Sequence, residues 1–218
     1  MGLMITKHLS ILLLLSLVTL TSRAQAIEGV NGEFSVDIGP VNLGQVVMSS
    51  TCKDSTCFYK SRAYGAFLFI KANVIELGSY QELDGQIVPI SSNYSERIGS
   101  DREAYTYNFS SLEITDQDSK AKVSELDKNA YPFIPLLNQV TLDLAHGVLK
   151  KSYQYVLKEK VKDVEVDSYS TTQTDKGMLH RITVKNKNRE MEFLFVNNGQ
   201  KLQFEEFNYR GFKMSRIK

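Results

Sequence analysis

Residues 132–149 read PFIPLLNQVTLDLAHGVL, and this stretch decides the fold. Its apolar residues recur at intervals of three and four, which places them in one stripe along a helix. Pro135 suits the first helical turn, and Gly147 suits a left-handed residue that ends a helix. Such a stripe must be buried, and we expect a sheet to bury it. The predicted stripe comprises Phe133, Leu137, Val140, Leu144 and Val148.

The residues on both sides of this helix alternate between apolar and polar, which is typical of half-buried strands. Asp84-Gly85 separates two such runs, residues 74–83 and 87–98, and predicts a hairpin. The apolar run at 66–70 fits either a buried strand or a short helical turn. The chain is therefore predicted to be mainly β, with a curled antiparallel sheet or half-barrel wrapped around one helix at about 133–148.

The N-terminus has the features of a secretory signal peptide. Lys7 and His8 precede an apolar run from Leu9 to Leu20, and the small-residue site Ala24-Gln25-Ala26 follows. The apolar run is shorter than the roughly 20 residues of a membrane span. We therefore expect residues 1–26 to be a cleaved signal peptide and residues 27–218 to form a single β-rich domain.

Cys52 and Cys57 are the two cysteines of the chain, and four residues separate them. If strands flank this loop, the two thiols face each other across it. An exported protein meets oxidising conditions, which favour a disulfide. The alternative, a redox pair, usually has the spacing C-x-x-C. We predict a structural disulfide, with the pairs Ser50–Tyr59 and Met48–Ser61 behind it.

Charge is nearly balanced, with 26 basic and 25 acidic residues. This balance gives no overall field for nucleic acid, so we expect no nucleic-acid partner. We expect no transmembrane span after signal removal. Arg210, Lys213 and Arg216 alternate along the last predicted strand. We interpret them as the solvated face of an exposed edge, and contact with an anionic envelope surface is the alternative.

Candidate catalytic and metal-binding groups are few. His146 lies near the end of the predicted helix, and His180 lies on a strand face with Met178, Ile182 and Val184, so we interpret both as structural. Asp116 and Asp118 fit a polar turn better than a calcium loop. Adjacent Glu205 and Glu206 point to opposite faces of a strand, which does not suit a paired-carboxylate mechanism. We therefore expect neither an enzyme, nor a metal site, nor a cofactor.

Many predicted strands carry aromatic residues on one face. If the strands curl, these faces line the inside of a half-barrel, and one helix does not cover so wide a surface. The alternative is that the rings pack fully on one another and on the helix. A remaining groove with tyrosine hydroxyls at its rim would suit a molecule with an acyl chain and a polar head. The candidate groove residues are Tyr105, Tyr107, Phe109, Tyr153, Tyr155, Phe193 and Phe195.

The order of several short segments resembles a family of exported bacterial proteins catalogued as domain of unknown function 3108. The segments are Phe34–Gly39, Val41–Val46, the hairpin Tyr80–Gly85 and Leu142–Gly147. The resemblance implies a periplasmic cell-envelope protein rich in antiparallel strands, and it transfers no catalytic residue.

Two functions are therefore expected. One is a non-catalytic binding module for an apolar or amphipathic envelope molecule such as a lipid. The alternative is a structural or protein-interaction role without a small-molecule ligand. The sequence leaves the oligomeric state open.

Overall fold

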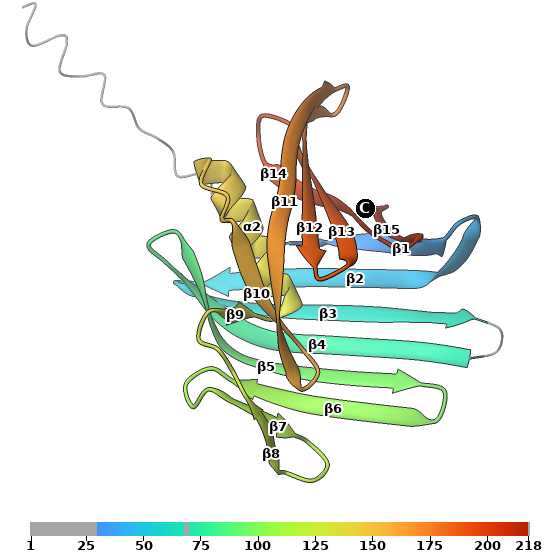
Figure 1. Cartoon of the computed structure of the whole chain (residues 1–218), viewed down its shortest axis with the longest axis vertical. Helices are drawn as coiled ribbons and strands as arrows, with labels where there is room; N and C mark the ends of the chain where they lie inside the picture. Colours follow the sequence, from blue (N-terminus) through green and yellow to red (C-terminus); the bar gives the residue numbers. More distant parts are fainter. Residues whose placement is uncertain (1–29, 68–69, 218) are drawn as a thin grey trace, which may run out of the picture.

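The computed structural model describes residues 30–67 and 70–217, and the predicted signal peptide lies outside them. The described chain contains fifteen strands and the helix α2 (Figure 1). The prediction of a mainly β fold with one helix in a curled sheet is confirmed. The elements are β1 (Gly32–Ile38), β2 (Val41–Lys53), β3 (Thr56–Phe67), β4 (Ile70–Leu83), β5 (Gln86–Ile98), β6 (Asp101–Asn108), β7 (Glu113–Asp116), β8 (Lys122–Glu125), β9 (Ala130–Tyr131), α2 (Phe133–His146), β10 (Ser152–Leu157), β11 (Lys160–Thr174), β12 (Gly177–Asn186), β13 (Arg189–Asn197), β14 (Leu202–Tyr209) and β15 (Phe212–Arg216).

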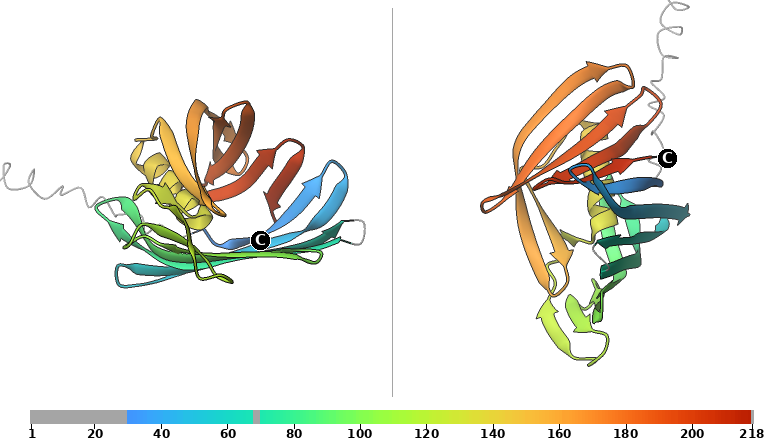
Figure 2. Two further views of the ribbon diagram at one scale, coloured as in Figure 1. Left: turned by 60° about the horizontal axis from the view of Figure 1, so that its bottom comes forward. Right: turned by 90° about the vertical axis from the view of Figure 1, so that its right-hand side faces the viewer.

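All fifteen strands belong to one sheet. Strands β1 to β8 pair in chain order, strands β10 to β15 do the same, and antiparallel pairing of β1 with β15 joins the two meanders. The short strand β9 pairs with β10 in parallel. Figure 2 shows that the sheet curls so that β1–β8 and β10–β15 face each other, with α2 at one end of the space between them. We call these two parts the first half and the second half.

The first half bends close to β1. A β-bulge interrupts the β1–β2 register between Val36 and Asp37, and a bulge bends a strand and increases its twist. Directly beside it, Gly44 and Gly65 lie opposite each other on β2 and β3. A Cβ on Gly44 would collide with the Tyr64 carbonyl, and one on Gly65 would collide with the Leu43 carbonyl. Glycine at both positions therefore permits the close approach of β2 and β3.

The helix begins and ends almost as predicted. Pro135 lies in the first turn, and Gly147 ends the helix in the left-handed conformation at φ 69°. The predicted stripe is only partly right. Leu137 is fully buried, but Val140 is half-buried and Val148, beyond the helix end, is 60% exposed. Strands of both halves contact α2, so apolar residues outside the predicted stripe are buried too. These are Ile134, Leu136 and Leu142.

Polar side chains on α2 connect it to both halves. Asn138 accepts from the backbone N–H of Val30 at 2.8 Å, and Gln139 accepts from the N–H of Ile87 at 2.7 Å. Asp143 accepts from the hydroxyl of Tyr153 in the second half at 2.7 Å. Buried polar groups are stable only when paired, so these bonds specify one position for the helix between the halves.

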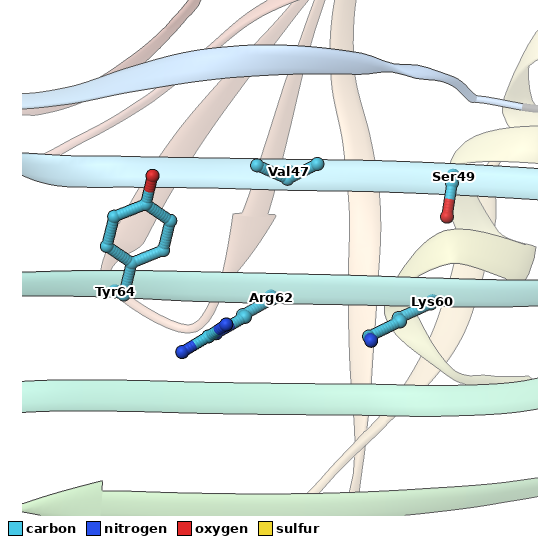
Figure 3. Close-up of a pocket in the computed structure, with 5 residues that line it drawn as sticks. All are labelled: Val47, Ser49, Lys60, Arg62 and Tyr64. Carbon is cyan, nitrogen blue, oxygen red and sulfur yellow. The ribbon is translucent and has the colours of Figure 1, made fainter.

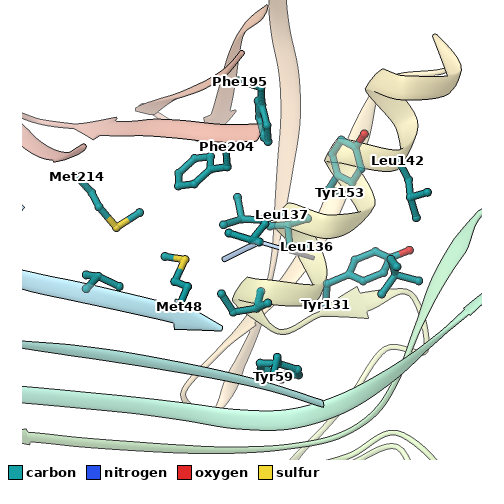
Figure 4. Packing of buried hydrophobic residues seen from close by; sticks show 14 of the residues in the cluster. Met48, Tyr59, Tyr131, Leu136, Leu137, Leu142, Tyr153, Phe195, Phe204 and Met214 are labelled. Atoms are coloured by element: carbon teal, nitrogen blue, oxygen red, sulfur yellow. The ribbon is translucent and has the colours of Figure 1, made fainter. Parts of the chain in front are cut away.

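Two apolar clusters form the core. The larger lies between α2 and the two halves, where Leu136 and Leu137 contact a cluster that includes Met48 and Phe204 (Figure 4). The smaller lies between β5, β6, β7 and β10. It contains Tyr94, Tyr105, Tyr107, Ile114, Leu126 and Val156.

The prediction of an exposed edge at the C-terminus is wrong. Strand β15 lies inside the sheet, between β1 and β14. Arg216 is accordingly half-buried, and its guanidinium lies 4.8 Å from the ring centroid of Phe34. The two edges of the sheet are instead β8 and β9, which have four and two residues. Such short strands offer little backbone for pairing with another chain.

Candidate functional site

The concave face carries a buried carboxylate where the first half meets the start of α2. Glu76 on β4 is only 9% exposed. It accepts a hydrogen bond from the hydroxyl of Tyr59 at 3.1 Å and another from the backbone N–H of Phe133, the first residue of α2. The first N–H groups of a helix lack intrahelical partners, and no side chain caps α2 from Pro132. Glu76 therefore supplies an acceptor that the helix itself lacks.

The pKa of the Glu76 carboxyl is raised towards neutral pH. Burial raises the pKa of its carboxyl from 4.5 to about 7, although the bonds from the Tyr59 hydroxyl and the Phe133 N–H oppose the shift. Burial and the charge of Glu76 also raise the pKa of the Tyr59 hydroxyl. The hydroxyl of Tyr107 and that of Ser92 are buried without a hydrogen-bond partner among the described residues. This cluster holds the start of the helix and is enclosed by the fold.

At the other end of the concave face, apolar side chains remain half-buried. The rings of Phe193 and Phe207 lie 5.0 Å apart, and those of Phe207 and Phe212 lie 6.3 Å apart. Figure 2 shows α2 at the opposite end of the space between the halves. We call this region the open-end surface, and it comprises Tyr155, Met191, Phe193, Phe207 and Phe212.

Small residues continue this surface onto the first half. Phe207 pairs with Met214, and Met214 pairs with Val36. From Val36 the same row continues across β2, β3 and β4 through Gly44, Gly65 and Ala72. These three residues present at most one methyl group each. The aromatic side chains of the second half therefore meet little side-chain bulk from the first half at this end.

Two cations adjoin the open-end surface. The ammonium of Lys162 lies 5.8 Å from the ring centroid of Tyr155. Partial burial, followed by the charges of Arg189, Lys160 and Lys158, lowers the pKa of Lys162. Burial raises the pKa of the Tyr155 hydroxyl, and the charge of Arg189 opposes that shift. Repulsion among these cations would be relieved by an anion bound beside Lys162 and Arg189.

The seven predicted groove residues do not form one surface. Tyr105, Tyr107 and Phe109 belong to the smaller cluster, and the other four belong to the larger one. Four of the seven are buried, because they pack against other core residues. Tyr155 and Phe193 alone of the seven lie in the open-end surface. The four buried side chains are Tyr105, Tyr107, Tyr153 and Phe195, and Phe109 is half-buried against the smaller cluster.

The predicted disulfide between Cys52 and Cys57 is confirmed. It joins directly opposite residues of β2 and β3 at the hairpin end. The predicted pairs Ser50–Tyr59 and Met48–Ser61 are also confirmed. A structural disulfide is typical of exported proteins.

The other candidate groups have structural surroundings. Asp116 accepts from the backbone N–H groups of Asp118 and Ser119, so the predicted polar turn is confirmed. The hydroxyl of Tyr169 lies 2.8 Å from Nδ1 of His180. His146 is exposed in the last turn of α2. Within residues 30–67 and 70–217, acidic, histidine and cysteine side chains form no group of three that could hold a metal ion.

Sequence reasoning missed Glu76 and most of the open-end surface. Glu76 alternates with Val74, Gly78 and Tyr80 along β4, so its inward direction could have been predicted from the strand period. Phe207 and Phe212 become neighbours of Phe193 only through the pairing of β13 with β14 and β14 with β15. These strands follow one another across short turns, but their register, which shifts at a bulge between Leu194 and Phe195, is not encoded in a local pattern.

Comparisons with known proteins give no further assignment. No protein-family model, curated protein or solved structure matches this chain. The resemblance to the exported bacterial family therefore stays a prediction. Of the chain that the structure describes, no helix has the length and apolar character needed to cross a membrane.

Proposed function

We propose that this chain is an exported, periplasmic, non-catalytic module that binds an amphipathic molecule with an acyl chain and an anionic head. The single observation that carries the proposal is the open-end surface with its adjoining cations. Tyr155, Met191, Phe193, Phe207 and Phe212 are half-buried on a concave face, where an acyl chain gains about 25 cal/mol for each Å² of apolar area that it buries.

The chemistry of the rim favours an anionic head. Partial burial and then the charge of Arg189 lower the pKa of Lys162, and no carboxylate among the described residues raises it. An incoming carboxylate or phosphate would bond to these cations and offset their mutual repulsion. A neutral lipid would gain the apolar contacts alone.

The direct test uses a fluorescent fatty acid whose emission rises in an apolar environment. The wild-type protein should bind it saturably, and Lys162→Glu combined with Arg189→Glu should weaken binding at least tenfold through charge reversal. Lys128→Glu combined with Lys176→Glu is the matched control, because both lysines are exposed in turns and the total charge changes equally. The control should bind like the wild type.

A second variant tests the apolar part. Phe207→Ser should weaken the binding of the fatty acid and of an uncharged analogue alike. The charge reversal should weaken the binding of the fatty acid only. If the folded wild-type protein binds neither probe, the binding-module proposal fails and the structural or protein-interaction role takes its place. If the wild-type protein does bind the probes, mass spectrometry of protein gently extracted from its host identifies the natural ligand.

A further inference from the structure

The outward face of β2–β5 differs in composition from the rest of the molecule. Residues opposite one another in neighbouring strands share a face, so the register identifies the outward positions. Basic residues occupy five of them, and no outward position of β2–β5 carries a carboxylate. The five are Lys53, Lys60, Arg62, Lys71 and Arg97.

None of these five cations forms an ion pair with a carboxylate among the described residues. Arg62 donates instead to the amide oxygen of Asn73 at 3.2 Å, and its guanidinium lies 5.5 Å from the ring centroid of Tyr64. Lys60 and Arg62 border a shallow depression on β2 and β3 with a volume of about 500 Å³ (Figure 3). Glu33, on the neighbouring strand β1, marks one border of the face.

Large apolar side chains stand exposed between the cations. Phe58 is 60% exposed and Leu77 is 44% exposed. Phe58 lies beside Lys60 along β3, and Leu77 lies directly opposite Lys60 on β4. Exposed apolar side chains interspersed with cations are the composition of elements that lie on a membrane surface. Tyr64 and Val88 are exposed on the same face.

We propose that this basic outer face, defined by the five cations with Phe58, Tyr64, Leu77 and Val88, docks on the surface of an anionic phospholipid membrane. The charges complement anionic head groups, and the exposed apolar side chains reach the acyl boundary beneath them. A nucleic acid would also attract the cations, but its phosphate backbone would leave Leu77 and Val88 in water. The proposal does not depend on the ligand of the concave face.

Co-sedimentation with vesicles tests the proposal. The full mature chain should bind phosphatidylcholine vesicles that contain about one third phosphatidylglycerol, and it should bind pure phosphatidylcholine vesicles far less. Binding should weaken as salt rises, because exposed charges are screened over about 10 Å at 0.1 M salt. Each basic residue near such a surface contributes about fivefold to partitioning, so Lys60→Glu with Arg62→Glu should weaken binding about 25-fold or more.

Two control variants and one further test variant make the result decisive. Lys128→Glu with Lys176→Glu should leave vesicle binding unchanged, as should Lys162→Glu with Arg189→Glu, which alters only the concave face. Phe58→Ser with Leu77→Ser should weaken binding and leave its salt dependence in place. Thermal unfolding checks that each variant is folded, and Lys60→Glu alone gives a milder variant if the double one unfolds.

Three outcomes would overturn the proposal. The first is equal binding to neutral and anionic vesicles. The second is an equal loss of binding in the Lys128 and Lys176 control. The third is tighter binding of a single-stranded oligonucleotide than of anionic vesicles, measured by fluorescence anisotropy, which would assign the face to nucleic acid instead.

Discussion

Glu76→Gln should change how the stability of this protein depends on pH. The carboxyl pKa is about 7 in the folded protein against an ordinary value of 4.5, and burial is the main cause. The folded state therefore binds this proton more tightly than the unfolded state. The stabilisation that this provides is fully present below about pH 4.5 and is lost as pH rises through 7. Each pKa unit corresponds to 1.36 kcal/mol, so the full loss is about 3 kcal/mol.

Glutamine mimics the protonated carboxyl in shape and keeps an acceptor for Phe133 or Tyr59. The variant should therefore lie within about 1 kcal/mol of the wild type at pH 5 and exceed its free energy of unfolding by about 1–3 kcal/mol at pH 8. Urea denaturation of both proteins at intervals from pH 5 to pH 8.5 measures this difference. Subtracting the two curves removes the contributions of all groups that the proteins share.

Glu82→Gln is the matched control, because Glu82 lies on the same strand but is exposed. Its difference from the wild type should stay nearly constant over the same pH range. A constant difference for Glu76→Gln, or one that favours the wild type as pH rises, would refute the reasoning. Either result would mean that Glu76 is solvated or that its charge is fully compensated by Tyr59 and the helix N-terminus.

The remaining predictions concern stability and are measured by denaturant unfolding. Leu137→Ala should cost about 2–5 kcal/mol because it leaves a cavity in the larger cluster, whereas Val148→Ala, at a 60% exposed position, should cost little. Replacing Cys52 and Cys57 with serine should cost about 2 kcal/mol or less, since the closed loop is short. Tyr153→Phe should cost about 1–3 kcal/mol, because it removes a donor from a buried carboxylate of α2.

The sequence predicted the positions of the strands and the helix better than it predicted which of their side chains are buried. Strand alternation and Asp84-Gly85 located β4 and β5, and Gly147 located the end of α2. The stripe on α2 was incomplete because periodicity assumes one buried side, and this helix has strands of both halves around it. Asn138 and Gln139 lie outside the apolar stripe, yet they are buried and bonded to the backbone of distant segments.

The candidate site was less accessible to sequence reasoning for a different reason. The aromatic alternation correctly marked inward faces, but it could not tell which rings are covered. Tyr107 is fully buried because β7 and the β10 region pack on it, whereas Phe193 stays half-buried at the end without a helix. Whether a ring is covered depends on how the two halves close on each other. That closure depends on the pairing of β1 with β15, the first and last strands of the described chain.

The near-neutral total charge conceals a segregation that the fold creates. Core packing constrains the inward positions of β2–β5, and it leaves the outward positions free to take any polar residue. A chain with 26 basic and 25 acidic residues should place both signs on such a face. Instead the face holds five cations, while buried or half-buried carboxylates such as Glu76 and Glu96 point from the same strands to the other side. The alternation of side chains along these strands therefore separates the two charge signs. The basic residues lie on the outer face, and the carboxylates lie on the inner face with the apolar core. Folding does not require this arrangement, and the proposed contact with an anionic membrane would give the basic outer face a function.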